Sequence, residues 1–195
     1  MSTNDRRNWQ VLLATLLLTG GLVALMLSGT SFSDEDIRAP IRYTAQIAFA
    51  LYLVVLLARP LQQLLRADWT AILLRNRRLV GVAFASTMTM HLALIVYRFG
   101  SQEDLSFSLN LFGAGAYAVF YAMLITSFDA PRKALGPKAW KILHRVGLIW
   151  AAIIFGLPRS IEDLTNPHYL KFGIPFTLAV LIRITAWQQS RRQDS

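Results

Sequence analysis

Long apolar runs alternate with short polar links along the whole chain. Each run is uncharged or nearly so and about as long as the roughly 20 apolar residues that a membrane-spanning helix needs. The runs cover residues 9–29, 40–58, 79–99, 105–128, 140–158 and 170–187. The pattern therefore predicts an all-α integral membrane protein, a six-helix bundle that forms a single transmembrane domain over residues 1–195.

The segment 61–74, between the second and third runs, has a different pattern. Its leucines and Trp69 alternate with polar residues, as they do in a helix with one apolar face. Helices of this kind lie in the plane of the membrane interface. We therefore predict an interfacial segment at 61–74, after Arg59 and Pro60 end the second run. At the other end of that run, Pro40 suits the first turn of a helix.

Basic residues are distributed unequally between the two sides that six spans would create. The side with both termini carries 15 of the 20 Lys and Arg residues and four of the 11 acids, a net charge of +11. The other side carries five bases and seven acids, a net charge of −2. Cytoplasmic loops of membrane proteins are enriched in Lys and Arg. We therefore predict a multi-pass protein of the bacterial inner membrane with both termini in the cytoplasm.

The composition narrows the chemistry that this bundle can perform. Charged residues make up 16% of the chain, against about 25% in soluble domains. The chain has no cysteine, which excludes disulfides, thiolate-bound metals, iron–sulfur clusters and covalent haem attachment. The net charge of +9 is explained by orientation in the lipid bilayer, so no nucleic-acid partner is predicted. The apolar runs lack acids and no helix looks broken, which disfavours a transporter.

One ionisable side chain, His91, lies inside the third run. Ionisable residues within membrane segments are functional-site candidates. At 100° per residue, Gly81, Phe84 and Met88 share the face of His91, so a flat cofactor could lie against this face. Arg77 and Arg78 precede the run and could pair with the propionates of such a cofactor.

His144 opens the fifth run, with Gly147 and Ala151 on the same face, which would leave room beside the imidazole. Histidines from two helices of a bundle can hold a b-type haem. His91, however, is predicted about 13 Å deeper than His144, from their distances to the run starts. Two arrangements stay open: both histidines bind one iron, or His144 binds a haem near Arg77 or Arg78 and His91 serves a second site or none.

Each histidine can also be explained without a cofactor. His91 could bond a backbone carbonyl or a serine across the bundle. His144, beside Lys141 and Arg145, could be solvated at the interface. His168, in an acidic link, is expected to be a loop residue. No phosphate-binding loop, catalytic carboxylate pair or nucleophile–base pair is present, so no catalytic residue is predicted.

Three stretches resemble the ferric reductase-like transmembrane domain family: RNRRLVGVAFASTMTMH at 75–91, ITS at 125–127 and LGPKAWKILHR at 135–145. The chain is most similar to a short bacterial branch of that family, the haem-binding membrane subunit of the periplasmic methionine sulfoxide reductase system. The resemblance implies haem b held by His91 and His144, with electrons passing from a cytoplasmic-side donor to a periplasmic acceptor.

Comparison with the family pattern also shows features that this chain does not have. The family usually has a further histidine in the fifth helix, where this chain has Leu157. One haem is therefore expected rather than two. No flavin or nicotinamide domain is present, so a separate donor, a flavin reductase or a quinol, and an outer-face redox partner are needed. The alternative function is a degenerate, haem-free membrane scaffold or partner subunit of the same fold.

Overall fold

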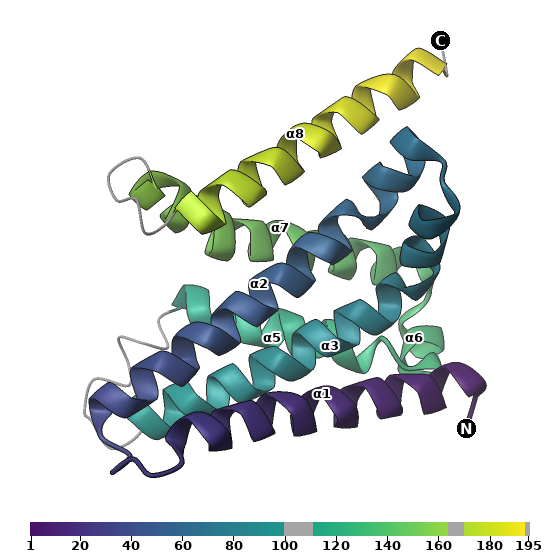
Figure 1. Cartoon of the computed structure of the whole chain (residues 1–195). Helices are drawn as coiled ribbons and strands as arrows, with labels where there is room; N and C mark the ends of the chain where they lie inside the picture. Colours follow the sequence, from purple (N-terminus) through teal and green to yellow (C-terminus); the bar gives the residue numbers. More distant parts are fainter. Residues whose placement is uncertain (100–110, 164–169, 194–195) are drawn as a thin grey trace.

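The structure, a computed structural model, describes residues 1–99, 111–163 and 170–193, and these form helices without any β-strand. In chain order the helices are α1 (Thr3–Leu27), α2 (Asp34–Leu65), α3 (Asp68–Phe99), α5 (Leu111–Ile125), α6 (Asp129–Leu135), α7 (Pro137–Asp163) and α8 (Leu170–Gln193). The long helices run in alternating directions, and the N-terminus and the last turn of α8 lie at the same end of the bundle (Figure 1). We call this end the terminal end. The predicted all-α class is confirmed.

Four helices in the described part are long and apolar enough to cross a membrane: α1, α2, α3 and residues 137–156 of α7. The apolar part of α5 is shorter, at Gly113–Ile125, and the first residues of the predicted span 105–128 lie outside the described residues. Large apolar side chains point outward, with Leu17, Leu18 and Leu25 each more than 70% exposed. Apolar surface of this kind suits contact with lipid. The count of six spans stays a prediction.

The second helix begins six residues before the predicted start at Pro40. Its start is a capping box: the Asp36 N–H donates to Ser33 Oγ at 3.3 Å, and the Ser33 N–H donates to the Asp36 carboxylate at 2.9 Å. The first turn also contains Asp34 and Glu35, whose charges favour the positive end of a helix dipole. These local interactions outweigh the preference of proline for the first turn, so Pro40 lies inside α2.

Residues 61–74 are divided between two helices. α2 continues through Pro60 to Leu65, and Arg66 then adopts a left-handed conformation with φ of 49°. α3 starts two residues later, and the buried Thr70 hydroxyl joins the helices by donating to the Gln62 side chain. α2 and α3 therefore form a tight helical hairpin. The location of this hairpin at the membrane interface stays a prediction.

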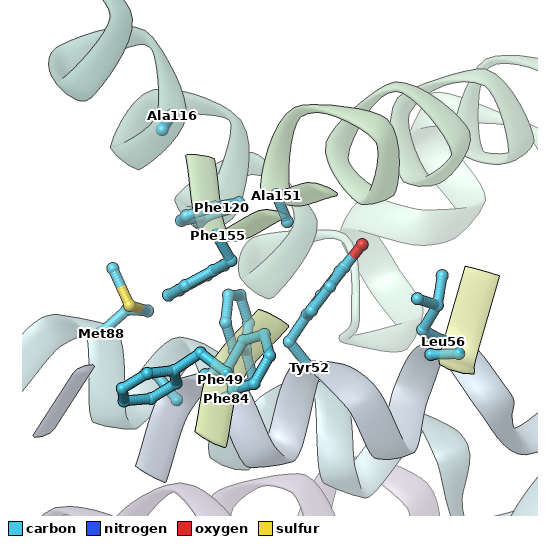
Figure 2. Close-up of a cluster of buried hydrophobic side chains, with 12 residues drawn as sticks. Phe49, Tyr52, Leu56, Phe84, Met88, Ala116, Phe120, Ala151 and Phe155 are labelled. Atoms are coloured by element: carbon cyan, nitrogen blue, oxygen red, sulfur yellow. The ribbon is translucent and has the colours of Figure 1, made fainter. Parts of the chain in front are cut away.

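Aromatic side chains fill the centre of the bundle, where α2, α3, α5, α7 and α8 meet (Figure 2). Phe84 contacts Phe120 and Phe155, with ring centroids 5.1 and 6.1 Å apart. Tyr52 stacks on Phe155 at 5.8 Å, and Phe49 lies 6.0 Å from the same ring. Such ring pairs are favourable beyond the area they bury. This cluster sets the spacing of the helices that carry both candidate histidines.

Candidate functional site

His91, on α3, contacts α2 through its imidazole. Its Nδ1 lies 3.0 Å from Thr44 Oγ1, and Thr44 is completely buried, at 0% exposure. Ile41, Met90 and Leu94, which flank the two residues in the sequence, belong to one hydrophobic cluster. The histidine and the threonine therefore form a polar contact between two helices, next to a hydrophobic cluster of described residues.

His144 lies in the second turn of α7 and is held by its own helix. Its Nδ1 is 3.1 Å from the Trp140 carbonyl oxygen, and its ring lies 4.1 Å from the Trp140 ring, tilted by 33°. Trp140 donates its indole N–H to the Thr126 carbonyl at 3.1 Å, and the Arg132 guanidinium lies 5.0 Å over its ring. The orientation of His144 thus depends on the packing between α5 and α7.

The partners of the two Nδ1 atoms indicate which ring nitrogen carries the proton. A carbonyl oxygen can only accept, so the proton of neutral His144 is on Nδ1. The Thr44 hydroxyl has one proton and two backbone carbonyls, of Pro40 and Ile41, within 3.0 Å to receive it. A proton donated to either carbonyl leaves the oxygen to accept from His91 Nδ1, whereas a proton donated to Nδ1 requires the His91 proton on Nε2, and the 3.0 Å contact fits both directions. In neutral His144 the lone pair is on Nε2, the arrangement found when a histidine binds a metal and donates its other N–H to a fixed acceptor.

Adjacent carbonyls at residues 126–127 provide a common reference level for α3 and α7. Trp140 donates to the first and Arg78 to the second, and both helices run from this level toward the end opposite the termini (Figure 1). His91 is 13 residues past Arg78, whereas His144 is four residues past Trp140. The difference of nine residues corresponds to about 13 Å along the helix axes.

A second contact gives an independent measure of the same separation. Tyr52 on α2 donates its hydroxyl to the Leu148 carbonyl on the antiparallel α7 at 3.2 Å. Thr44, the partner of His91, is eight residues from Tyr52 toward the far end, and His144 is four residues from Leu148 toward the terminal end. These intervals amount to about 18 Å. Both measures place the two histidines at different levels of the bundle.

The central aromatic cluster lies between these two levels. Phe84 is seven residues from His91 along α3, on the side of the terminal end, and Phe49 lies between Thr44 and Tyr52 along α2. Phe84 and Phe49 are only 8% and 4% exposed. The face predicted for a flat cofactor is therefore occupied at Phe84 by ring contacts, whereas a side chain at Gly81 would have no neighbour within 4 Å.

The room expected beside His144 is filled by a neighbouring helix. A methyl group at Gly147 would overlap the Met123 sulfur of α5 and lie 3.1 Å from Val119. Ala151, on the same face, is 2% exposed and belongs to the central cluster. The expectation of open space at Gly147 is thus not met, because the missing side chain lets α5 pack closely against α7.

The neighbouring arginines Arg77 and Arg78 have different surroundings. Arg78 pairs with Asp129 at 3.1 Å, lies 3.9 Å from Asp5 and donates to the Ser127 carbonyl. The Ser2 hydroxyl also donates to Asp129 at 2.6 Å. This hydrogen bond and the Arg78 guanidinium hold the pKa of Asp129 below its ordinary value. Arg78 therefore joins the start of α1 to the start of α6.

Arg77 points to another side of α3 and has no hydrogen bond or ion pair with any described residue. The charges of Arg59 on α2 and Arg183 on α8 act on it, and its own charge acts on His144. Three cations from three helices thus act on one another, and no acid among the described residues forms an ion pair with Arg77. Of the two predicted partners for a propionate, Arg77 is the one whose guanidinium is available to an anion.

Two residues that the sequence singled out cannot be placed. His168 and the side chain of Leu157 lie outside the described residues. Thr44, in contrast, was missed from the sequence, although a hydroxyl within the apolar run 40–58 is a signal that could have drawn attention to it. Met123 gave no signal, since one methionine in a long apolar run is typical of any membrane helix.

Comparison with known proteins gives the family. Residues 44–156 match the family described as "Ferric reductase like transmembrane component", and this match covers more than half of the chain. The chain belongs to this family. It is also 24% identical, over 198 aligned residues, to the protein-methionine-sulfoxide reductase heme-binding subunit MsrQ of Herminiimonas arsenicoxydans, and the alignment covers 95% of this chain and 88% of that protein. No solved structure matches the chain.

The matched region includes the whole candidate site. It begins at Thr44 and ends at Gly156, and it contains Arg77, His91 and His144. The resemblance seen in the sequence is therefore confirmed for the ferric reductase-like family, and the residues that carried it lie where α2, α3, α5 and α7 pack together.

Proposed function

We propose that this protein is a haem-binding, electron-transfer subunit of a membrane oxidoreductase. Membership of the ferric reductase-like family and the similarity to a heme-binding subunit support the proposal. The structural observation that carries it is the hydrogen bonding of the two imidazoles, because His144 donates its Nδ1 proton to the Trp140 carbonyl and His91 Nδ1 lies 3.0 Å from Thr44 Oγ1, so each ring is held through Nδ1.

Three residues of the chain would hold haem b. His144 and His91 would serve as axial ligands through Nε2, and Arg77 would pair with a propionate at the edge nearer the terminal end. Arg78 could pair with a propionate only by exchanging Asp129 for it. Bound haem supplies a one-electron couple between ferric and ferrous iron.

We infer that the two histidines serve separate ligand positions, which allows two haems per chain where Leu157 in place of a histidine led us to expect one. Two side chains that hold one iron must both reach the same atom, whereas the two measures along the helices separate His91 from His144 by about 13 and 18 Å. An imidazole reaches only a few ångströms from its helix, so helix tilt would have to supply most of the difference.

The charge asymmetry supports an orientation in the membrane, and with it a direction for electron transfer. The terminal end carries most of the Lys and Arg residues, which favours a cytoplasmic location for it. His144 and Arg77 lie nearer this end than His91 does. We propose that electrons from a separate donor, a flavin reductase or a quinol, enter on the His144 side and leave toward an outer-face partner on the His91 side.

The absorption spectrum of the purified full chain tests this proposal. Protein from haem-replete cells should show a Soret band and sharp visible bands on reduction. The haem content, measured per chain after extraction, should fall when either histidine is replaced. A colourless preparation that takes up no added haem would refute haem binding.

A second candidate function is a haem-free scaffold of the same fold. The observation in its favour is packing, since the aromatic cluster and Met123 fill the space between α5 and α7. The same spectrum separates the two functions, because a scaffold would fold and remain stable without any haem absorbance.

A further inference from the structure

Thr44 is placed to control the chemistry of His91. It lies on α2 and is 0% exposed, and its Oγ1 is 2.9 Å from the Pro40 carbonyl, 3.0 Å from the Ile41 carbonyl and 3.0 Å from His91 Nδ1. The threonine therefore joins the backbone of its own helix to an imidazole 47 residues away in the sequence.

The Thr44 hydroxyl has one proton and three neighbours that can receive it, the two carbonyls and His91 Nδ1. Threonine side chains inside helices commonly donate to the carbonyl four residues back. With the proton donated within α2, the oxygen keeps a lone pair for His91, which then donates its Nδ1 proton to it. In that arrangement Thr44 fixes both the orientation of the His91 ring and the nitrogen that carries its lone pair.

We propose that Thr44 donates its proton within α2, accepts from His91 Nδ1 and is thereby the positioning residue for His91 as a haem ligand, a role that rests on the proposed haem-binding function. Partners that accept the second N–H of a ligating histidine fix its tautomer and raise the basicity of the ligating nitrogen. A more basic Nε2 favours the more highly charged ferric iron. Thr44 therefore strengthens ferric haem binding at the His91 position and lowers the reduction potential there.

A purely structural role predicts different behaviour. If the hydroxyl only satisfied a buried polar group, its loss would destabilise the α2–α3 contact without changing the tautomer or the potential. Thr87 provides the matched control because it is also 0% exposed. It lies one turn before His91, and its hydroxyl bonds only the Ala83 carbonyl of its own helix, at 3.0 Å, among the described residues.

The first measurement needs no haem. The full chain, labelled with ¹⁵N at histidine and prepared without haem, is compared with Thr44→Val, Thr44→Ser and Thr87→Val by NMR of the imidazole nitrogens, with His91→Asn to assign the signals. We expect the Nδ1–H tautomer of His91 in the unchanged chain, in Thr44→Ser and in Thr87→Val. Thr44→Val should shift His91 toward the Nε2–H tautomer.

The second measurement uses haem-loaded protein. Loss of such a partner typically costs 10- to 100-fold in metal affinity, so Thr44→Val should weaken ferric haem binding at least about tenfold. A tenfold loss confined to the ferric state corresponds to an upward shift of about 59 mV in the midpoint potential. Thr44→Ser should restore both values, and Thr87→Val should leave both unchanged.

The outcomes separate this inference from the function on which it rests. If the unchanged chain takes up no haem, both are refuted. If haem binds and depends on His91, but Thr44→Val keeps the tautomer, affinity and potential of the unchanged chain, only the role of Thr44 is refuted. Equal losses in Thr44→Val and Thr87→Val would also refute it, since any buried threonine would then have the same effect.

Discussion

Replacing the two histidines separately and together tests how many ligand positions the bundle contains. The levels of His91 and His144 differ by about 13 Å along α3 and α7 and by about 18 Å through α2. If each imidazole serves its own ligand position, as proposed above, their losses should be independent. Each single alanine variant should lose only the haem that its own histidine holds, and the double variant should retain none.

The assay is the haem content per chain, measured with the reduced-minus-oxidised spectrum of each variant in detergent. With both positions filled, each single variant should retain about half of the original haem, and the two difference spectra should sum to that of the unchanged chain. His168→Ala is the control, since this histidine lies in the acidic link and is expected to hold no haem. A chain with one haem that either single substitution removes completely would refute the separation of the two positions.

Three further predictions concern packing and charge. Gly147→Ala should destabilise the fold by about 1–3 kcal/mol, because its methyl group would overlap the Met123 sulfur, and adding Met123→Ala should recover part of this loss in unfolding assays. Phe155→Ala should cost about 3 kcal/mol, since this 5% exposed ring contacts three others; an unchanged melting temperature would contradict the packing. The lowered pKa of Asp129 means that its carboxylate stabilises the fold above the ordinary value of 3.8. The advantage over Asp129→Asn in thermal unfolding should therefore vanish as the pH falls below that value, and a difference that persists at lower pH would argue against it.

Local sequence signals account for much of the helical architecture. The apolar runs predicted α1, α2, α3 and α7 because burial in lipid requires a continuous apolar stretch whatever the rest of the chain does. The earlier start of α2 also has a local signal, the capping box of Ser33 and Asp36. The prediction missed it because it gave more weight to Pro40 as a residue of the first turn. α6, with seven residues, was missed because so short a helix has no hydrophobic periodicity.

The candidate site could be predicted only in part. His91 and His144 were evident as ionisable groups in or beside apolar runs, and the estimate of their difference in depth agrees with the contacts at residues 126–127. The expected partner of His91 was a backbone carbonyl or a serine, and only the packing of α2 on α3 identifies Thr44. The space at Gly147 was misjudged because a glycine indicates close approach without showing what approaches.

The sequence alone determined that the chain is a bundle of apolar helices with its basic residues gathered toward one end, because these properties depend only on length, composition and order. Only the tertiary structure decided what the polar groups inside the bundle do. Arg77 and Arg78 are chemically identical neighbours, yet only Arg78 meets Asp129, since successive residues point about 100° apart around a helix. His91 and His144 likewise became distinct sites only when contacts between helices set their levels, because the depth of a residue depends on where its helix is held by the others.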